Sequence, residues 1–152
     1  MRTTGKILAT LVLALTVAMF GFSQQATEDE KERLAIRQAA LDYIEGWYEA
    51  NPERMERALH PDLVKSYVVK LHTGKDILQS VSALAMVEFT RAGGGSKTPK
   101  DQQKNDVTIL DVSGNIAAVK CVSADYVDYL HLAKTNGQWK IVNALWESRK
   151  KK

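Results

Sequence analysis

Residues 125–147 read Asp-Tyr-Val-Asp-Tyr-Leu-His-Leu-Ala-Lys-Thr-Asn-Gly-Gln-Trp-Lys-Ile-Val-Asn-Ala-Leu-Trp-Glu. Two runs rich in β-branched and aromatic residues flank Asn136-Gly137. That dipeptide suits a two-residue type I′ turn, because both central positions of such a turn need positive φ. The stretch therefore predicts a β-hairpin whose strands are joined at Asn136 and Gly137.

The turn also predicts a register for this hairpin, in which Asp128 faces Leu145 and Leu130 faces Asn143. Side chains alternate along a strand. One face is then expected to carry Tyr126, Asp128, Leu130, Leu132, Ile141, Asn143 and Leu145, and the other Val127, Tyr129, His131, Ala133, Lys140, Val142, Ala144 and Trp146. Both faces are largely apolar, whereas a sheet with one face in water alternates apolar with polar residues. We expect the chain's own helices to cover one face and a second subunit the other.

The N-terminal residues differ in composition from the rest of this 152-residue chain. Arg2 and Lys6 precede an uncharged run, residues 7–22, and small residues follow at the two positions that a signal peptidase reads. The pattern predicts a signal peptide over residues 1–23 and a single domain over residues 24–152. The protein is then secreted or periplasmic and meets the membrane only through the transient signal peptide. An uncleaved membrane anchor is the alternative, although the run is short for a bilayer span.

The charge balance of the domain argues against nucleic-acid binding. The chain has 21 basic and 18 acidic residues, and without residues 1–23, which contain two basic residues, 19 basic residues remain against 18 acidic. A nucleic-acid footprint would need clustered basic residues. The single cysteine, Cys121, forms no internal disulfide and reads as a small buried hydrophobe. His60, His72 and His131 do not converge, so no metal site is predicted, and no motif indicates a cofactor.

The order of elements predicts an α+β layered fold. A helix is expected from Thr27, with one apolar stripe formed by Ile36, Ala40, Tyr43, Ile44 and Trp47. Asn51-Pro52 should cap and start a short second helix, and Ser82 should cap a third, which ends at Gly93-Gly94-Gly95. Strands are expected at residues 62–69, 76–81, 106–112 and 116–123, before the hairpin. Helices followed by strands favour helices packed on one face of an antiparallel sheet.

This order of elements resembles the nuclear transport factor 2-like, or cystatin-like α+β, superfamily, and within it the exported bacterial branch labelled putative lumazine-binding. The resemblance is carried by residues 42–48, 60–65, 90–95, 128–132 and 139–143. It implies a curved antiparallel sheet wrapped around a long N-terminal helix, which gives a cone-shaped molecule with a central pocket. A strongly twisted sheet leaves such a cavity because the helix cannot fill the whole concave side.

Asp128 and Asn143 would be the polar groups in an otherwise apolar concave face. Each then needs a hydrogen-bond partner or a ligand. With Tyr43, Trp47, Tyr67 and Tyr126 they form the predicted ligand-binding set. The first hypothesis is an unknown small, partly apolar molecule that is bound and not transformed.

Two alternatives stay open. Ketosteroid isomerases and polyketide cyclases of the superfamily use a pocket Asp or His as general base, so the resemblance implies that Asp128 could act as a base with a tyrosine as donor. In the competing structural reading, Asp128 bonds Asn143, a backbone group or a lysine and takes no part in chemistry. In the second alternative the pocket is filled by side chains and the domain is a ligand-free interaction module.

On the opposite face, four residues form a patch too apolar to be left in water. They are Tyr129, His131, Val142 and Trp146. Members of the superfamily commonly dimerise through this surface. The sequence therefore predicts a homodimer formed through the sheet.

Overall fold

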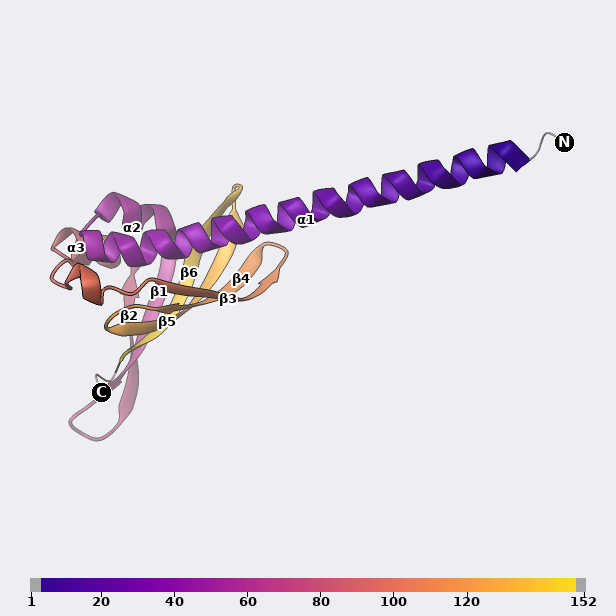
Figure 1. Ribbon diagram of the computed structural model, residues 1–152. Coiled ribbons are helices and arrows are strands. Elements are labelled where there is room, and N and C mark those ends of the chain that lie inside the picture. Colours follow the sequence, from indigo (N-terminus) through magenta and orange to yellow (C-terminus); the bar gives the residue numbers. More distant parts are fainter. Residues whose placement is uncertain (1–3, 150–152) are drawn as a thin grey trace. The chain divides into compact units, whose positions relative to one another are not determined.

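Figure 1 shows a computed structural model of the chain, which describes the backbone of residues 4–149 and the side chains of residues 27–149. The chain forms two compact units, Met1–Leu34 and Ala35–Lys152. The first unit contains the beginning of α1, a helix that spans Thr4–Glu49. The predicted helix start at Thr27 is wrong, because Gln24, Gln25 and Ala26 are good helix formers and Thr27 lies inside the helix.

The predicted signal peptide, residues 1–23, lies outside the residues whose side chains are described, and its cleavage stays a prediction. Across the described part of the chain, no helix has the length and apolar character needed to span a membrane.

The second unit combines the end of α1 with two further α-helices, a short 3₁₀-helix and six strands. These elements are α2 (Pro52–Ala58), β1 (Leu59–Lys70), β2 (Asp76–Ser82), α3 (Ala83–Arg91), η1 (Lys100–Gln102), β3 (Asp106–Ser113), β4 (Ile116–Val122), β5 (Tyr126–Thr135) and β6 (Gln138–Ser148). The α+β prediction is confirmed. The two predicted caps are also confirmed, since the side chain of Asn51 accepts from Arg54 N and that of Ser82 accepts from Ala85 N.

The six strands form one sheet in the order β2-β1-β6-β5-β4-β3. All neighbours are antiparallel except β1 and β6, which run parallel. A parallel pair needs a long connection, and the chain from β2 to β5 provides it. The tight turn of the β5–β6 hairpin is the one predicted, with φ of 51° at Asn136 and 75° at Gly137.

A β-bulge makes the predicted register wrong beyond the first pairs of this hairpin. Leu132 pairs with Ile141, but His131 pairs with Asn143, so Val142 is one extra residue in β6. Asp128 therefore faces Trp146 instead of Leu145. Because one residue exchanges the two faces of a strand, β6 beyond Val142 turns Trp146 inward and Asn143 and Leu145 outward.

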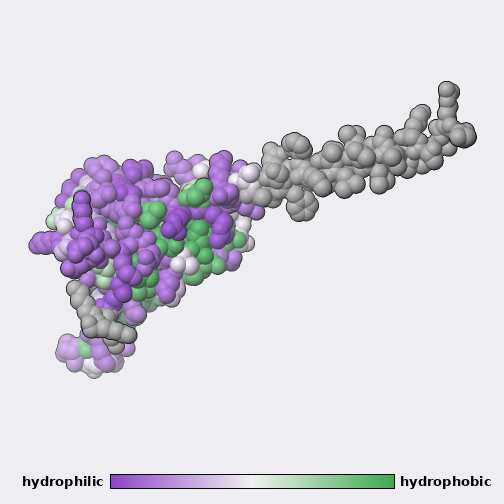
Figure 2. All heavy atoms as spheres, viewed as in Figure 1, coloured by the Kyte–Doolittle hydropathy of each residue, from purple (hydrophilic) through white to green (hydrophobic). Residues whose placement is uncertain are grey.

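The core lies between the sheet and the helices of the second unit. Its α1 members are Ile36, Ala39, Ala40, Tyr43, Ile44 and Tyr48, and its members from the central strands include Val119, Leu130, Leu132, Ile141 and Ala144. The face of the sheet that bears these strand residues is called here the inner face. Figure 2 shows mostly hydrophilic residues on the viewed surface, with hydrophobic residues gathered in patches.

Two of the three glycines after α3, Gly94 and Gly95, pack against Trp47. The amide of Gly95 donates to the Trp47 carbonyl at 2.9 Å. A Cβ atom at Gly95 would lie 2.5 Å from Cδ1 of the Trp47 ring, and Gly94 has a φ of +47°. The glycines therefore serve a close approach between this segment and α1, which agrees with the predicted helix end and connector.

We expect Gly95→Ala to lower the free energy of unfolding by about 1–3 kcal/mol, because the new methyl group overlaps the Trp47 ring. Thermal and urea denaturation followed by circular dichroism measure this loss. Ser96→Ala, at the exposed next position, should change stability by less than about 0.5 kcal/mol. Equal stability of the two variants would contradict the close packing.

Candidate functional site

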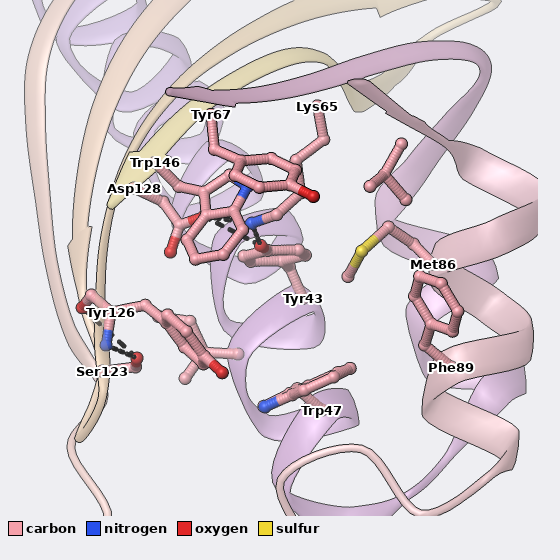
Figure 3. Close-up of a pocket in the computed structure, with 12 residues that line it drawn as sticks. Tyr43, Trp47, Lys65, Tyr67, Met86, Phe89, Ser123, Tyr126, Asp128 and Trp146 are labelled. Atoms are coloured by element: carbon pink, nitrogen blue, oxygen red, sulfur yellow. Dashed lines mark hydrogen bonds and ion pairs between the residues drawn. The ribbon is translucent and has the colours of Figure 1, made fainter. Parts of the chain in front are cut away.

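The second unit contains a cavity of about 250 Å³ on the inner face of the sheet. Its walls come from α1, α3 and strands β1, β2, β5 and β6, and the lining is mostly aromatic and aliphatic (Figure 3). The lining residues are Tyr43, Ile44, Trp47, Lys65, Tyr67, Val81, Met86, Phe89, Ser123, Tyr126, Asp128 and Trp146. Such a lining with a few convergent polar groups is typical of a small-molecule site.

The structure brings five of the six predicted ligand-binding residues to this cavity. Tyr43, Trp47, Tyr67, Tyr126 and Asp128 line it. Asn143 does not, because the bulge turns it to the other face, where its Nδ2 donates to the Val64 carbonyl at 3.0 Å. The ligand-binding role of these residues stays a prediction.

Because of the bulge, only some of the residues predicted for the outer face lie there. Tyr129 and His131 are exposed there, as expected, and Val142 is the bulged residue. The outward position predicted for Trp146 is wrong, since its indole lines the cavity. The ring packs against Tyr67 at 4.9 Å between centroids and edge-on against Tyr126 at 5.1 Å.

The polar floor of the cavity is formed by Tyr43, Lys65 and Asp128. Lys65 Nζ lies 2.5 Å from Asp128 Oδ1 and also donates to the Tyr43 hydroxyl. The Tyr43 hydroxyl donates to the same Asp128 oxygen at 2.9 Å. The exposed fractions are 6 % for Tyr43, 6 % for Lys65 and 3 % for Asp128. The polar groups of these three residues thus bind one another, as their burial requires.

Burial is the largest influence on the pKa values of Lys65 and Tyr43. It lowers the pKa of Lys65, while the Asp128 carboxylate opposes that shift. It raises the pKa of Tyr43 well above 10, and the charge of Asp128 adds to that effect. Tyr43 therefore stays a neutral donor. Nearby, burial raises the pKa of the Cys121 thiol to about 12, so this cysteine is an unreactive core residue at neutral pH.

Lys65 is the charged residue of the cavity wall that the sequence analysis missed. It belongs to β1, where alternation places Leu63, Lys65 and Tyr67 on one face. Tyr67 was predicted to line the pocket, so the same alternation could have placed Lys65 there. Lysine side chains are mostly exposed in proteins, so the residue type alone pointed away from the cavity.

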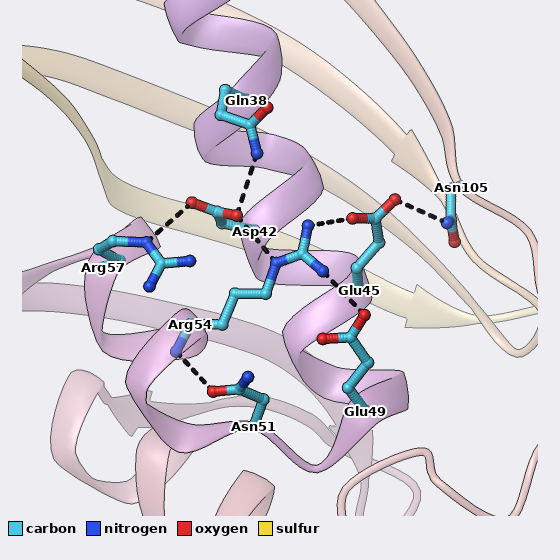
Figure 4. Close-up of polar contacts among 8 residues, drawn as sticks. All are labelled: Gln38, Asp42, Glu45, Glu49, Asn51, Arg54, Arg57 and Asn105. Carbon is cyan, nitrogen blue, oxygen red and sulfur yellow. Dashed lines mark hydrogen bonds and ion pairs between the residues drawn. The ribbon is translucent and has the colours of Figure 1, made fainter.

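A second polar cluster joins α1 to α2 (Figure 4). Arg54 binds Asp42 at 2.9 Å, Glu49 at 2.9 Å and Glu45, and Arg57 binds Asp42 at 3.3 Å. Burial tends to raise the pKa of Asp42, but the hydrogen bonds from Arg54, Arg57 and Gln38 outweigh it and hold that pKa below its ordinary value. The carboxylates are bound by their own chain, so this cluster is a structural clamp.

A wider hollow of about 550 Å³ lies beside α2, α3 and the hairpin turn. It holds none of the buried polar side chains of the described residues. Within the part of the chain that the structure describes, no three His, Cys, Asp or Glu residues are grouped so as to hold a metal ion. The 250 Å³ cavity is therefore the candidate site.

Comparison with known proteins agrees with this fold. A family model described as "Putative lumazine-binding" matches residues 31–147. The chain belongs to this family. No curated protein matches the chain.

Several solved structures are similar to this chain at low sequence identity, and three of them are described here. An NTF-2 like protein of unknown function from Silicibacter pomeroyi is 16 % identical, with coverage of 80 % of this chain and 98 % of that chain and a TM-score of 0.60. An NTF2-like protein with a cystatin-like fold from Novosphingobium aromaticivorans is 12 % identical, with 85 % and 89 % coverage and a TM-score of 0.60. A putative scytalone dehydratase from the same organism is 16 % identical, with 82 % and 89 % coverage and a TM-score of 0.56.

At these identities the similarity shows the fold. The nuclear transport factor 2-like, cystatin-like architecture implied by the sequence resemblance is confirmed.

Proposed function

We propose that this protein binds a small, partly apolar molecule in the 250 Å³ cavity and does not transform it. One observation carries the proposal. The cavity wall is aromatic and aliphatic, and the charged groups in it are already bound to each other. A preformed space of this kind offers apolar burial to a ligand.

The pairing of Asp128 supports binding over catalysis. A general base must be free to take a proton from its substrate. Asp128 accepts from Lys65 and from Tyr43, and protonating it would leave the buried Lys65 charge without its counterion. The size of the cavity also argues against a pocket filled by its own side chains, as the ligand-free interaction module would require.

Native mass spectrometry of the protein purified from its own source tests this proposal by detecting a retained ligand. Val81→Phe should abolish the retained mass, because Val81 lines the cavity and a larger side chain fills it. Leu84→Phe, an exposed position outside that cavity, should leave it unchanged. Absence of any retained ligand, or its loss from Leu84→Phe and not from Val81→Phe, would reject this cavity as the site.

The second candidate is an isomerase- or cyclase-type enzyme with Asp128 as general base. The burial of Asp128 beside the neutral donor Tyr43 in an apolar cavity favours it. Such an enzyme would catalyse deuterium exchange at the carbon next to a ketone carbonyl in D₂O. We expect no exchange of 2-acetylnaphthalene protons above the level of the Asp128→Asn variant, and a clear excess would favour the enzyme.

The signal-like N-terminus supports export, so we place this function in the secreted or periplasmic space.

We also propose a homodimer that is formed through the outer face of the sheet. Exposed apolar side chains gather there on β1, β2, β5 and β6, and they are Val64, Val68, Leu78, Tyr129 and Leu145. A patch of this kind is typical of a protein interface.

Leu145→Lys should convert the dimer to a monomer in sedimentation equilibrium, because a charge in the centre of an apolar interface is desolvated without a partner. Leu145 is 50 % exposed in the single chain. Leu110→Lys, on the edge strand β3 with a similar exposure of 52 %, should stay dimeric. A monomeric unmodified protein would reject the dimer.

A further inference from the structure

The carboxylate of Asp128 has one oxygen that the polar floor of the cavity does not use. Lys65 Nζ and the Tyr43 hydroxyl both donate to Oδ1, at 2.5 Å and 2.9 Å. No hydrogen bond from a described residue reaches Oδ2. Figure 3 shows one oxygen of Asp128 on the dashed lines and the other directed away from them, on the side of Tyr126. A carboxylate oxygen in a buried residue needs a hydrogen-bond donor.

This oxygen can be reached from the cavity. Asp128 lines the cavity and is 3 % exposed. Among the described residues, the side-chain polar atoms that are sealed from solvent without a partner are Asn105 Oδ1 and Trp146 Nε1, and Asp128 Oδ2 is not one of them. It therefore keeps accessible surface, and a donor inside the cavity can contact it.

The groups next to this oxygen are already engaged. The Tyr43 hydroxyl donates to Asp128 and accepts from Lys65. The Lys65 ammonium lies over the rings of Tyr43 and Trp146, at 5.2 Å and 4.9 Å from their centres. A ligand at the floor of the cavity therefore meets one acceptor that is still available, Asp128 Oδ2.

The remaining polar groups of the wall do not require a ligand. Ser123 Oγ is hydrogen-bonded to the backbone of Tyr126, and the Tyr67 hydroxyl donates to Gln79. The Tyr126 hydroxyl and the Trp47 indole belong to half-buried residues, where water can serve as partner. Asp128, in contrast, is buried.

The charges of the floor select an uncharged donor. Asp128 is paired with Lys65 at 2.5 Å. A cationic ligand would add a positive charge beside the buried ammonium, and an anionic ligand would add a negative charge beside the buried carboxylate. Like charges in a buried site repel strongly. An O–H or N–H group without formal charge satisfies Oδ2 and avoids both costs.

The volume and the lining define the rest of the molecule. An apolar cavity of roughly 150 Å³ holds benzene. The cavity of about 250 Å³ therefore suits a ligand of about two fused rings. Its other walls include Val81, Met86 and Phe89, which offer carbon surface alone apart from the Met86 sulfur.

We propose that the ligand is a small, uncharged, largely apolar molecule with an O–H or N–H donor that binds Asp128 Oδ2. This inference rests on the proposed function, since it names the class of molecule bound in the same cavity. Asp128 then accepts a hydrogen bond from the ligand and keeps its contacts with Lys65 and Tyr43.

Probes that share one ring system test the inference by isothermal titration calorimetry. 2-Naphthol carries an O–H donor, 2-methoxynaphthalene keeps the oxygen without the donor, and naphthalene has neither. 2-Naphthol should bind about tenfold more tightly than either, because hydrogen bonds to an ionised group are among the strong ones. The (2-naphthylmethyl)ammonium cation should bind more weakly than 2-naphthol.

Asp128→Asn tests the acceptor with little change of shape. Lys65 and Tyr43 hold the side-chain oxygen at the Oδ1 position, so an N–H group takes the place of Oδ2. The tenfold preference for 2-naphthol over 2-methoxynaphthalene should fall to about equal binding. Asp106→Asn is the matched control, because Asp106 also pairs with a lysine but is exposed and outside the cavity wall, and it should keep the preference.

Lys65→Met/Asp128→Leu gives an independent measurement if Asp128→Asn does not fold. It removes the acceptor together with its counterion. The preference for 2-naphthol over naphthalene should fall from about tenfold to about equal binding, while naphthalene still binds the apolar cavity.

The failures of the two proposals are distinguishable. If none of the probes binds the unmodified protein and no ligand is retained from its source, the proposed function fails. If 2-naphthol and naphthalene bind equally, ligand binding stands and the donor assignment is overturned, with water as the partner of Asp128 Oδ2. Loss of the preference in Tyr126→Phe, together with its retention in Asp128→Asn, also overturns the assignment. Tighter binding of the cation, or a retained ligand that is charged or has no O–H or N–H group, overturns the ligand class.

Discussion

Replacing Lys65 with Met should lower the free energy of unfolding by about 3–5 kcal/mol, the usual loss when one partner of a buried ion pair is removed. The variant leaves the Asp128 carboxylate, which is 3 % exposed, without a counterion. Of the two donors described for Asp128 Oδ1, only the Tyr43 hydroxyl, 2.9 Å away, would remain. Urea denaturation at pH 7, followed by circular dichroism, measures the loss.

The double variant Lys65→Met/Asp128→Leu is the control for this prediction. It removes both charges together, and replacing a buried pair by apolar side chains of similar size is often neutral or stabilising. We expect it to recover most of the stability that Lys65→Met loses, which gives a large coupling energy in a double-mutant cycle. If the single and double variants are equally unstable, the loss comes from packing and the ion pair makes no special contribution.

Replacing Arg54 with Met should cost about 2–4 kcal/mol at pH 7, because it leaves a half-buried group of carboxylates unpaired. The Arg54 side chain is 17 % exposed and contacts Asp42, Glu45 and Glu49 of α1. Arg57→Met is the matched control. Its side chain is 61 % exposed and makes a single 3.3 Å contact with Asp42, so its loss should be below about 1 kcal/mol.

The pH dependence of the Arg54 variant is a second readout. The pKa of Asp42 in the folded protein lies below its ordinary value of 3.8. Its ionised form therefore contributes stability above about pH 3.8, and that contribution is lost as the pH falls through the lower folded value. The gap in stability between the unmodified protein and Arg54→Met should then narrow below about pH 4. A gap that stays constant from pH 7 to pH 3 would show that Arg54 acts through packing alone.

Local sequence signals predicted most of the fold. Asn136-Gly137 places the hairpin turn, Asn51 and Ser82 cap their helices, and the glycines after α3 end it, because each of these depends on the conformational preferences of a few neighbouring residues. The family resemblance added the curved sheet and the pocket. Five of the six residues predicted for the site also line the cavity.

The features that the sequence did not predict depend on contacts between segments that are distant along the chain. The bulge at Val142 lies where the parallel pairing of β6 with β1 also shifts its register, between Leu59 and Val64, and nothing in the sequence around Val142 marks it. Lys65 and Asp128 are 63 positions apart, so their pairing requires the strand order β1-β6-β5. Likewise, the sequence alone indicates that Arg54 is a surface residue of a short helix. Its contacts with Asp42 and Glu45 appear only in the folded structure, where α1 lies beside α2.

The extra residue at Val142 decides which side chains of β6 beyond it face the cavity and which face outward. Removing or adding one residue there would exchange these two sets. Deleting it would send Trp146 toward the outer face and bring Leu145 into the cavity, while the turn and the pairs next to it stay in place. An insertion or deletion of one residue would thus exchange the side chains that this end of β6 presents to the cavity and to the outer face in one event. In this chain, the number of residues between the hairpin turn and Trp146 therefore decides which side chains at the end of β6 line the cavity.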